Sequence, residues 1–169
     1  MKRLLLLTTV LMMLITAVRG NEIVTLHVTR VVDGDTFEGY VGNGSGSALN
    51  QITVRINGID APERGQNYGD VAAAFLHRCI CGKTVQLELV QKDRYGRWVA
   101  KVSLEGVDVA GEMLKNGLAW YYKEYENNPR YAQLEAGARL RRLGLWNDDR
   151  AVAPWEWRKM SRAERDLYR

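Results

Sequence analysis

The sequence contains few of the side chains that bind transition metals or form covalent cross-links. Its two histidines, His27 and His77, stand isolated, and its two cysteines, Cys79 and Cys81, are separated by one residue. A zinc site needs several clustered ligands, so these residues do not predict one. Their scarcity also argues against a hydrolytic site built on histidine-bound metal. A disulfide between Cys79 and Cys81 would be strained, so we expect two buried or half-buried thiols.

The first twenty residues have the pattern of a secretory signal peptide. Met1-Lys2-Arg3 is basic, residues 4–18 are apolar apart from three threonines, and Val18-Arg19-Gly20 places small residues at the −3 and −1 positions of a cleavage site. The apolar run is short for a bilayer span, although an uncleaved anchor is the alternative. No cysteine follows the run to accept a lipid. We therefore expect an exported protein, periplasmic or extracellular, without stable membrane association after cleavage.

The chain without residues 1–20 has almost no net positive charge. Residues 1–20 hold three basic residues and no acidic one, so their removal leaves 21 Lys and Arg against 20 Asp and Glu. The mature protein would then be near +1. A broad basic field is therefore no argument for a nucleic-acid partner, and such an argument has to come from local positions.

Beyond the signal peptide, strand and helix patterns alternate. Period-two alternation predicts five short strands, over residues 23–32, 36–41, 51–59, 84–90 and 98–104. Helical periodicity predicts three helices, over residues 68–80, 108–115 and 129–143, the second with Asp108 as its N-cap and Gly117 beyond its end. This order predicts an α+β fold with a mainly β core, a five-stranded OB-type barrel, with a mixed α+β sandwich as the alternative. We expect the domain to span residues 21–150 and a charged tail without an obvious core to span residues 151–169.

Four carboxylates fall at the ends of two predicted strands. Asp33 and Asp35 lie in a turn after the first strand, and Asp60 and Glu63 follow the third. A single aspartate in such a place is typical of an ordinary turn. Clustered carboxylates, however, repel one another unless a cation lies between them. Because all the ligands would be oxygen atoms, the pattern predicts a hard ion, Ca²⁺ or Mg²⁺.

Two arginines complete a hypothesis about chemistry. Arg55 alternates away from the apolar face of its strand, and Arg97 follows a Tyr-Gly turn. A lone arginine at either place would be an ordinary solvated side chain. Beside a cation, two guanidinium groups can bind a phosphodiester and stabilise its transition-state charge, while a free carboxylate orients or deprotonates water.

Four segments resemble the successive motifs of the staphylococcal nuclease (thermonuclease) family. They are Val31–Thr36, Val54–Glu63, Asp93–Arg97 and Gly117-Leu118-Ala119, and the resemblance covers about Ile23 to Trp146. It implies a secreted bacterial OB-fold nuclease, monomeric and dependent on Ca²⁺ in preference to Mg²⁺. Such an enzyme would cleave DNA, RNA or both with little sequence preference, leaving 3′-phosphates.

The resemblance also implies roles for individual residues. Asp35 and Asp60 would bind the cation together with the backbone carbonyl of Ala61, and Asp33 would lie behind these ligands without touching the cation. The catalytic residues would be Arg55 and Arg97, which hold the scissile phosphate, and Glu63, which acts on the attacking water. Tyr95 and Tyr125 would contact the substrate.

Two positions depart from the family pattern. Ala61 stands where the family often has threonine, a change that keeps a carbonyl ligand and loses a hydroxyl contact. Of the paired tyrosines that follow the Gly-Leu-Ala segment, only Tyr125 matches in simple register, and Tyr121 or Tyr122 is a candidate for the other.

Two functions without catalysis compete with the nuclease hypothesis. A non-catalytic OB-fold module that binds nucleic acid is the stronger, although degenerate members of such a family lose the acidic and arginine positions that are all present here. An oligosaccharide-binding barrel is weaker, because it has no use for paired arginines. The tryptophans are expected to pack rather than to bind bases, and the basic residues of the tail to lie on a solvated helix face.

Overall fold

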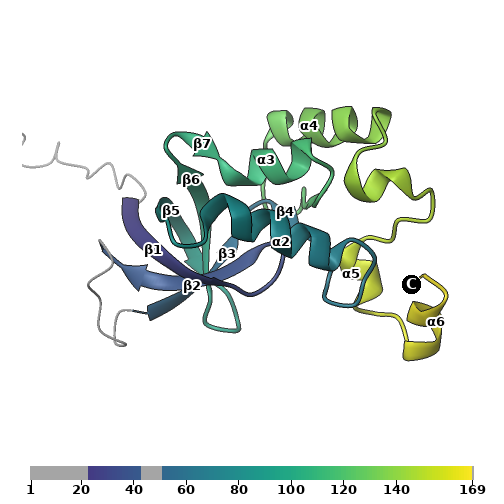
Figure 1. The fold of residues 1–169 in the computed structure, drawn as a ribbon, viewed down its shortest axis with the longest axis horizontal. Coiled ribbons are helices and arrows are strands. Elements are labelled where there is room, and N and C mark those ends of the chain that lie inside the picture. The colour runs from purple at the N-terminus through teal and green to yellow at the C-terminus, as the bar shows by residue number, and fades with distance from the viewer. Residues whose placement is uncertain (1–22, 43–50, 169) are drawn as a thin grey trace, which may run out of the picture.

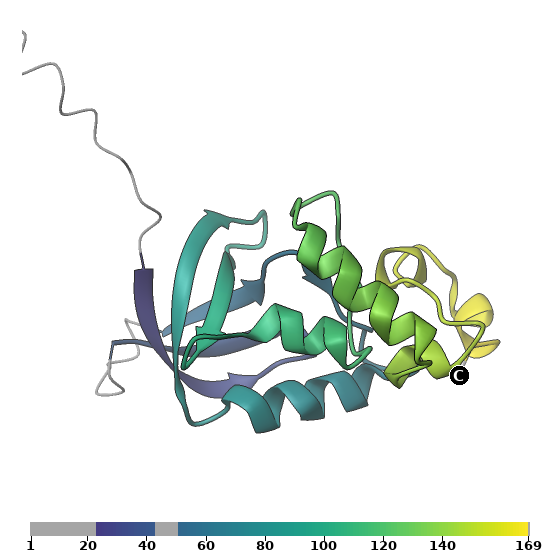
Figure 2. The same ribbon diagram turned by 90° about the horizontal axis from the view of Figure 1, so that it is seen from above.

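The computed structural model describes residues 23–42 and 51–168. The predicted signal peptide over residues 1–20 lies outside this range, as do residues 43–50, which include the Gly- and Ser-rich sequence between the second and third predicted strands. The core is a barrel of five strands, with helices gathered at one end of it (Figures 1 and 2). Among the described residues, no helix has the length and apolar character that crossing a membrane requires.

Hydrogen bonding runs continuously around the barrel. Its antiparallel order is β3 (Gln51–Ile56), β2 (Thr36–Val41), β1 (Ile23–Val31), β5 (Thr84–Lys92) and β6 (Trp98–Leu104). A parallel pairing between β3 and β6, with Val54 opposite Trp98, closes the ring. The short strand β7 (Val107–Asp108) pairs with the end of β6. The predicted OB-type barrel is therefore confirmed, and the sandwich alternative is wrong.

Alternation along β3 separates the core from the site. Val54 and Ile56 point into the barrel and are fully buried, whereas Arg55 points to the opposite face. The interior is filled by aliphatic side chains from β1, β3, β5 and β6 and by Phe37 of β2. This packed hydrophobic interior fixes the backbone from which the polar side chains project.

The third predicted strand is shorter than expected. It ends at Ile56 rather than Ile59, because Asn57 and Gly58 form a turn in which Gly58 adopts φ of 78°, a conformation that glycine takes without a steric penalty. The chain then forms β4 (Ile59–Asp60), which pairs with β8 (Trp120–Tyr121) in a separate two-stranded sheet. This turn brings the carboxylate of Asp60 within hydrogen-bonding distance of Arg55 on β3.

The three predicted helices are present with small changes at their ends. They are α2 (Gly69–Ile80), α3 (Val109–Lys115) and α4 (Pro129–Leu140). The last ends three residues early, since Arg142 and Gly144 have positive φ. Asp108 precedes α3 but its side chain does not cap the helix; it accepts a hydrogen bond from the Tyr131 hydroxyl at 3.1 Å. The prediction of Asp108 as a side-chain cap was wrong, while Gly117 follows α3 with φ of 66°, as expected.

The C-terminal segment packs on the domain more closely than a solvated tail would. It contains the 3₁₀ helix η2 (Gly144–Asn147) and the short helices α5 (Pro154–Trp157) and α6 (Arg162–Asp166), which lie at the end of the molecule away from the start of β1 (Figure 1). Trp157 is only 3% exposed, and Ala153 and Pro154 are buried. Trp146 is buried as well, so the expectation that these tryptophans pack is confirmed for both. Cys79 and Cys81 are free thiols, each partly exposed.

Candidate active site

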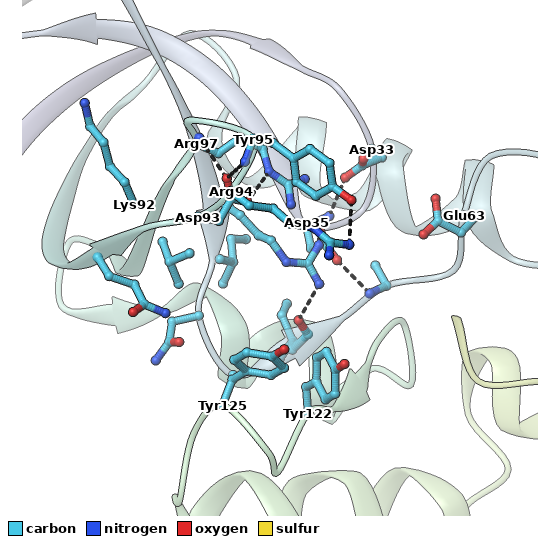
Figure 3. A pocket seen from close by; sticks show the side chains of 18 of the residues that line it. Asp33, Asp35, Glu63, Lys92, Asp93, Arg94, Tyr95, Arg97, Tyr122 and Tyr125 are labelled. Atoms are coloured by element: carbon cyan, nitrogen blue, oxygen red, sulfur yellow. Dashed lines mark hydrogen bonds and ion pairs between the residues drawn. The ribbon is translucent and has the colours of Figure 1, made fainter. Parts of the chain in front are cut away.

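One pocket of about 580 Å³ lies at the rim of the barrel. Strand ends and turns from distant parts of the chain contribute polar and aromatic side chains to it (Figure 3). Those of interest are Asp33, Asp35, Arg55, Ala61, Glu63, Tyr95, Arg97, Tyr122, Tyr125 and Arg158. All of the predicted site residues except Asp60 therefore line one cavity.

The turn between β1 and β2 places the first carboxylates. The side chain of Asp33 accepts a hydrogen bond from the backbone N–H of Asp35 at 3.0 Å, which fixes the turn. Gly34 lies so close to Ala61 and Ala72 that an added Cβ would come within 2.8 Å of both side chains. Glycine is therefore needed here so that the turn can approach the segment after β4 and helix α2. Asp33 therefore supports the position of Asp35 through this turn, and it lines the pocket as well.

Arg55 joins the two buried aspartates. Its Nη1 donates to Oδ1 of Asp35 at 2.6 Å, and its Nη2 donates to Oδ1 of Asp60 at 2.7 Å. Asp35 also accepts from the hydroxyl of Thr36 at 2.9 Å and from the N–H of Ala61 at 2.9 Å. Asp60 is fully buried, and Asp35 nearly so. Two neighbouring carboxylates are thus held out of water around one guanidinium.

This arrangement perturbs both kinds of group. Burial raises the pKa of Asp35 to about 6; the nearby Asp33 and Asp60 add to the rise, and Arg55 and the Ala61 N–H oppose it. Burial by itself would lower the pKa of Arg55, but Asp35 and Asp60 outweigh it and raise that pKa, so the guanidinium stays charged. The site therefore carries more negative charge than Arg55 alone neutralises, which favours the approach of another cation.

A tight loop after β4 presents Glu63. Its backbone N–H donates to Oε1 of Gln66 at 3.0 Å, and its carbonyl accepts from the N–H of Gln66 at 3.0 Å. Gly69, the first residue of α2, packs so closely on the Glu63 carbonyl that no side chain fits between them. The Glu63 carboxylate itself is 37% exposed and faces the pocket. The backbone of this residue is therefore fixed, and its side chain reaches the pocket.

The turn between β5 and β6 holds Arg97. Asp93 accepts from the backbone N–H of Arg97 at 3.0 Å and from its Nε at 2.7 Å. Among the described residues only Asp93 accepts from this side chain, so the two terminal nitrogens remain for another acceptor. Burial alone would raise the pKa of Asp93, but the hydrogen bonds from Arg97 and from the Tyr95 N–H lower it below its usual value. Tyr95 is 68% exposed on the same turn.

Aromatic side chains form the wall opposite this turn (Figure 3). Tyr125 is exposed, and its ring meets that of Tyr122 edge to face, with centroids 4.6 Å apart. Both line the pocket. Tyr121 is occupied elsewhere, since its hydroxyl bonds the Glu126 carbonyl and the Asn128 N–H. Of the two candidates for the second tyrosine, Tyr122 is the one that reaches the site, and it stacks on Trp155 at 5.1 Å between centroids.

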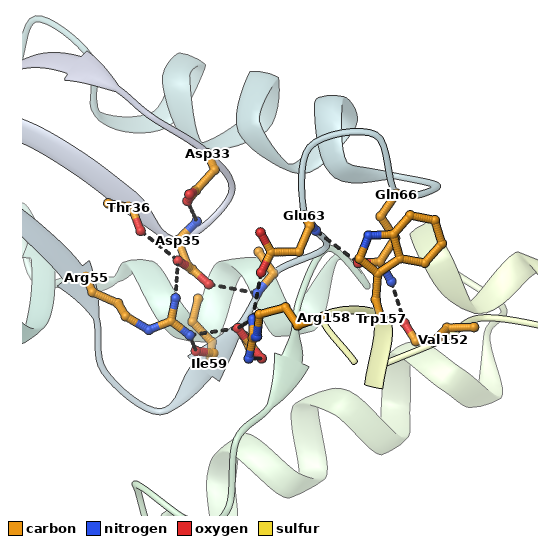
Figure 4. Close-up of polar contacts among 12 residues, drawn as sticks. Asp33, Asp35, Thr36, Arg55, Ile59, Glu63, Gln66, Val152, Trp157 and Arg158 are labelled. Atoms are coloured by element: carbon orange, nitrogen blue, oxygen red, sulfur yellow. Dashed lines mark hydrogen bonds and ion pairs between the residues drawn. The ribbon is translucent and has the colours of Figure 1, made fainter. Parts of the chain in front are cut away.

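Sequence reasoning missed Arg158. Its Nη2 donates to Oδ2 of Asp60 at 2.8 Å, and its Nη1 donates to Oε1 of Glu63 at 2.6 Å and to Oδ1 of Asp60 at 3.2 Å (Figure 4). The expectation that the basic residues of the tail lie on a solvated face is therefore wrong for this residue. The available signal was the pair Trp155 and Trp157 beside it, because two large aromatic side chains indicate packing rather than a free tail.

The oxygen atoms of this site are the kind of ligand that a hard divalent cation prefers. Asp35, Asp60 and the segment at Ala61 offer oxygen atoms, and the two carboxylates lie buried on either side of Arg55. Within the described residues, however, no three His, Cys, Asp or Glu side chains are gathered as a ready cation site. Arg55 and Arg158 stand between the carboxylates instead. The residues fit Ca²⁺ or Mg²⁺, provided that a guanidinium gives way.

Comparison with known proteins agrees with this geometry. A family model described as staphylococcal nuclease homologue matches residues 53–148. The chain is 37% identical over 133 residues to an uncharacterized endonuclease of Escherichia coli O157:H7, covering 78% of this chain and 83% of that protein. It is 33% identical over 162 residues to an uncharacterized endonuclease of Haemophilus influenzae, covering 95% and 88%. A staphylococcal-like nuclease of Arabidopsis thaliana is 40% identical over 112 residues, which are 66% of this chain and 35% of the plant protein.

Proposed function

The chain belongs to the family of staphylococcal nuclease homologues, and from this premise we propose that it is a metal-dependent nuclease that hydrolyses phosphodiester bonds of DNA, RNA or both. The observation that carries the proposal is the gathering of Asp35, Arg55, Glu63 and Arg97 around one pocket. Three distant segments supply these side chains, and each side chain has a use in phosphodiester hydrolysis.

Cation binding falls to the buried end of the site. Asp35, Asp60 and the Ala61 carbonyl would hold Ca²⁺, whose chemistry when bound is to polarise the phosphate and offset its charge. Asp33 keeps Asp35 in place through the turn that its side chain closes. Oxygen-only ligands favour Ca²⁺ over metals that prefer nitrogen or sulfur.

Arg97 and Arg55 meet the charge of the substrate. Asp93 orients Arg97 through Nε and leaves its two terminal nitrogens for phosphate oxygens, a fork that suits bidentate binding. Arg55 stays charged on the floor of the same pocket. Because charge on the phosphate increases in the transition state, donors placed there beforehand lower the barrier.

Glu63 activates the water. Its carboxylate takes a proton as the water oxygen attacks phosphorus, and the bond from phosphorus to the O5′ atom of the next nucleotide breaks. The leaving oxygen takes a proton from solvent and Glu63 releases its own proton to solvent, so the products are a 3′-phosphate and a 5′-hydroxyl. Tyr95, Tyr122 and Tyr125 provide hydroxyl and ring contacts to the flanking nucleotides, and stacking of this kind tolerates any base. Little sequence preference follows.

The test uses the protein without residues 1–20, incubated with labelled DNA and RNA in the presence of Ca²⁺, Mg²⁺ or a chelator. We expect cleavage with Ca²⁺, none with the chelator, and products whose 3′ ends become ligatable only after phosphatase treatment. Substrate that is bound but never cut, under either metal, would refute the nuclease and would establish the binding module instead.

Export is a second part of the proposal. The basic and apolar pattern of residues 1–20 supports secretion by a cleaved signal peptide. Expression of the full chain in a bacterium with two membranes, followed by fractionation and N-terminal sequencing, tests it. Mature protein beginning at Asn21 in the periplasm or medium is the expected result, and full-length protein in the cytoplasm or membrane would contradict it.

A further inference from the structure

Arg158 comes from a part of the chain that lies beyond the matched family region. The family model ends at residue 148, and Arg158 immediately follows helix α5. Even so, this arginine lines the main pocket and forms three hydrogen bonds with Asp60 and Glu63 (Figure 4). A residue outside the matched region thus contacts both a proposed cation ligand and the proposed general base.

The contacts leave little room on Asp60 for a cation. Its Oδ1 accepts from Arg55 at 2.7 Å and from Arg158 at 3.2 Å, and its Oδ2 accepts from Arg158 at 2.8 Å. A carboxylate oxygen has two lone pairs, so Oδ1 is filled. The side chain of Asp60 is 1% exposed, and it is the one proposed ligand that does not line the pocket. No ion can reach it unless a neighbour moves.

Arg158 is the neighbour that can move. Its side chain is 42% exposed at the pocket, whereas that of Arg55 is 17% exposed and also holds Asp35. Side chains that reach solvent can change rotamer without disturbing the core, so Arg158 can turn toward the pocket while Arg55 keeps its place. The burial by itself would lower the pKa of Arg158, but the bonds to Asp60 and Glu63 raise it, so the guanidinium is charged in these ion pairs.

The backbone that carries Arg158 is firmly attached. Trp157 is buried, and Gln66 donates to the Val152 carbonyl at 2.7 Å, which connects this segment to the Glu63 loop. Arg165 donates to the carbonyls of Trp157 at 3.1 Å and Arg158 at 3.2 Å. The packing of the C-terminal segment therefore holds Arg158 at the site.

We propose that Arg158 sets the affinity of the site for its divalent cation. Its guanidinium competes with the cation for the oxygen atoms of Asp60, and it gives up Asp60 when the cation binds. This inference rests on the proposed function, and it adds a positioning residue that acts through Asp60 and Glu63. Release of Arg158 also frees Oε1 of Glu63, the oxygen atom that this ion pair occupies.

Removal of Arg158 should therefore strengthen cation binding. Two effects have the same sign: the competing donor disappears, and one positive charge no longer repels the ion. The expected change is about tenfold in dissociation constant, which is modest because Arg158 is partly exposed and its pairing is weakened by solvent.

The experiment titrates the cation alone, without nucleic acid. Isothermal titration calorimetry with CaCl₂ is done on wild type, Arg158→Gln, Arg158→Lys and Lys159→Gln, each stripped with chelator and shown to be folded by circular dichroism. Lys159 is the matched control, since it pairs with Glu156 on the surface and loses the same charge without touching the site. We expect Arg158→Gln to bind Ca²⁺ about tenfold more tightly than wild type. Arg158→Lys should show a smaller gain in affinity, because lysine keeps the charge but lacks the two-pronged guanidinium. Lys159→Gln should bind Ca²⁺ within about twofold of wild type.

The outcomes distinguish a failure of this inference from a failure of the proposed nuclease function. If wild type binds Ca²⁺ and cuts DNA, but Arg158→Gln binds the ion equally or more weakly, the inference is wrong and the nuclease stands. If wild type neither binds Ca²⁺ nor cuts, both are wrong. Should Arg158→Gln fail to fold, Arg158→Lys decides: binding no tighter than wild type overturns the proposal, and tighter binding supports it.

Discussion

Replacement of Arg97 by alanine should lower the rate of cleavage much more than it lowers the free energy of unfolding. In the folded protein this side chain makes one partly exposed ion pair, Nε to Oδ2 of Asp93 at 2.7 Å, and the two side chains are 27% and 18% exposed. Exposed pairs of this type are worth about 0.5 kcal/mol, so the free energy of unfolding should fall by about 1 kcal/mol or less. The backbone bonds within the turn do not depend on the side chain and remain.

The effect on catalysis should be several times larger. Loss of one donor that stabilises transition-state charge costs about 10²–10³ in rate, or about 3–4 kcal/mol. The assay is single-turnover cleavage of a labelled oligonucleotide with saturating Ca²⁺, accompanied by urea unfolding of the same preparation in chelator. Arg30→Ala is the control, because Arg30 of β1 pairs with Glu38 of β2, does not line the pocket, and loses the same guanidinium group when it is replaced.

Two results would refute this reasoning. A rate loss below about tenfold in a folded variant would place Arg97 outside the transition-state contacts. A fall in the free energy of unfolding large enough to depopulate the folded state would make Arg97 a structural residue. Arg30→Ala should cut at the wild-type rate, and a loss there would show that overall charge, not position, supports binding.

Three further predictions concern single residues. Glu63→Gln should lower the single-turnover rate by about 10²–10⁴ with little change in unfolding by urea, and a near-normal rate would exclude Glu63 as the base. Trp157→Ala should lower the free energy of unfolding by about 3–5 kcal/mol in the same urea assay, since it empties a buried site; a change under about 1 kcal/mol would mean that the C-terminal segment is not part of the cooperative unit. The pKa of Asp93 is depressed in the folded protein, so its stabilising effect is present above its unfolded value of 3.8 and disappears as pH falls through the folded value. Wild type should therefore lose more stability than Asp93→Asn between pH 6 and pH 3, and equal losses in the two proteins would contradict the depressed pKa.

Local features of the fold were predictable because short-range physics controls them. Alternation located the β-strands, and the Gly-rich turns and the glycine after α3 marked where elements stop. The third strand was one exception, because a single Asn-Gly pair inside an apolar run gives a weak signal for a turn. That turn matters for the site, since it is what carries Asp60 to the guanidinium of Arg55.

The predicted site residues gathered largely as expected. Eight of the nine line one pocket, and only Asp60 lies beneath it. Side-chain alternation put Arg55 on the polar face, and the order of the motifs put Asp35, Glu63 and Arg97 at neighbouring strand ends. Their catalytic roles stay predictions until the cleavage experiments are done. Tyr122 was one of two candidates, and the choice between them required knowing which hydroxyl was already bonded to the backbone.

The sequence by itself determined the kind of molecule: a β-barrel whose strand ends carry oxygen ligands and arginines. These properties follow from residue type and from spacing along a strand, which are local. Only the tertiary structure decided which charges meet. Arg158 bonds to Asp60 across 98 positions of sequence. It can do so because the C-terminal segment packs on the domain through the buried Trp157, which places Arg158 against the oxygen atoms of Asp60. Pairing at that separation depends on how the whole chain packs, because no local pattern contains the partner.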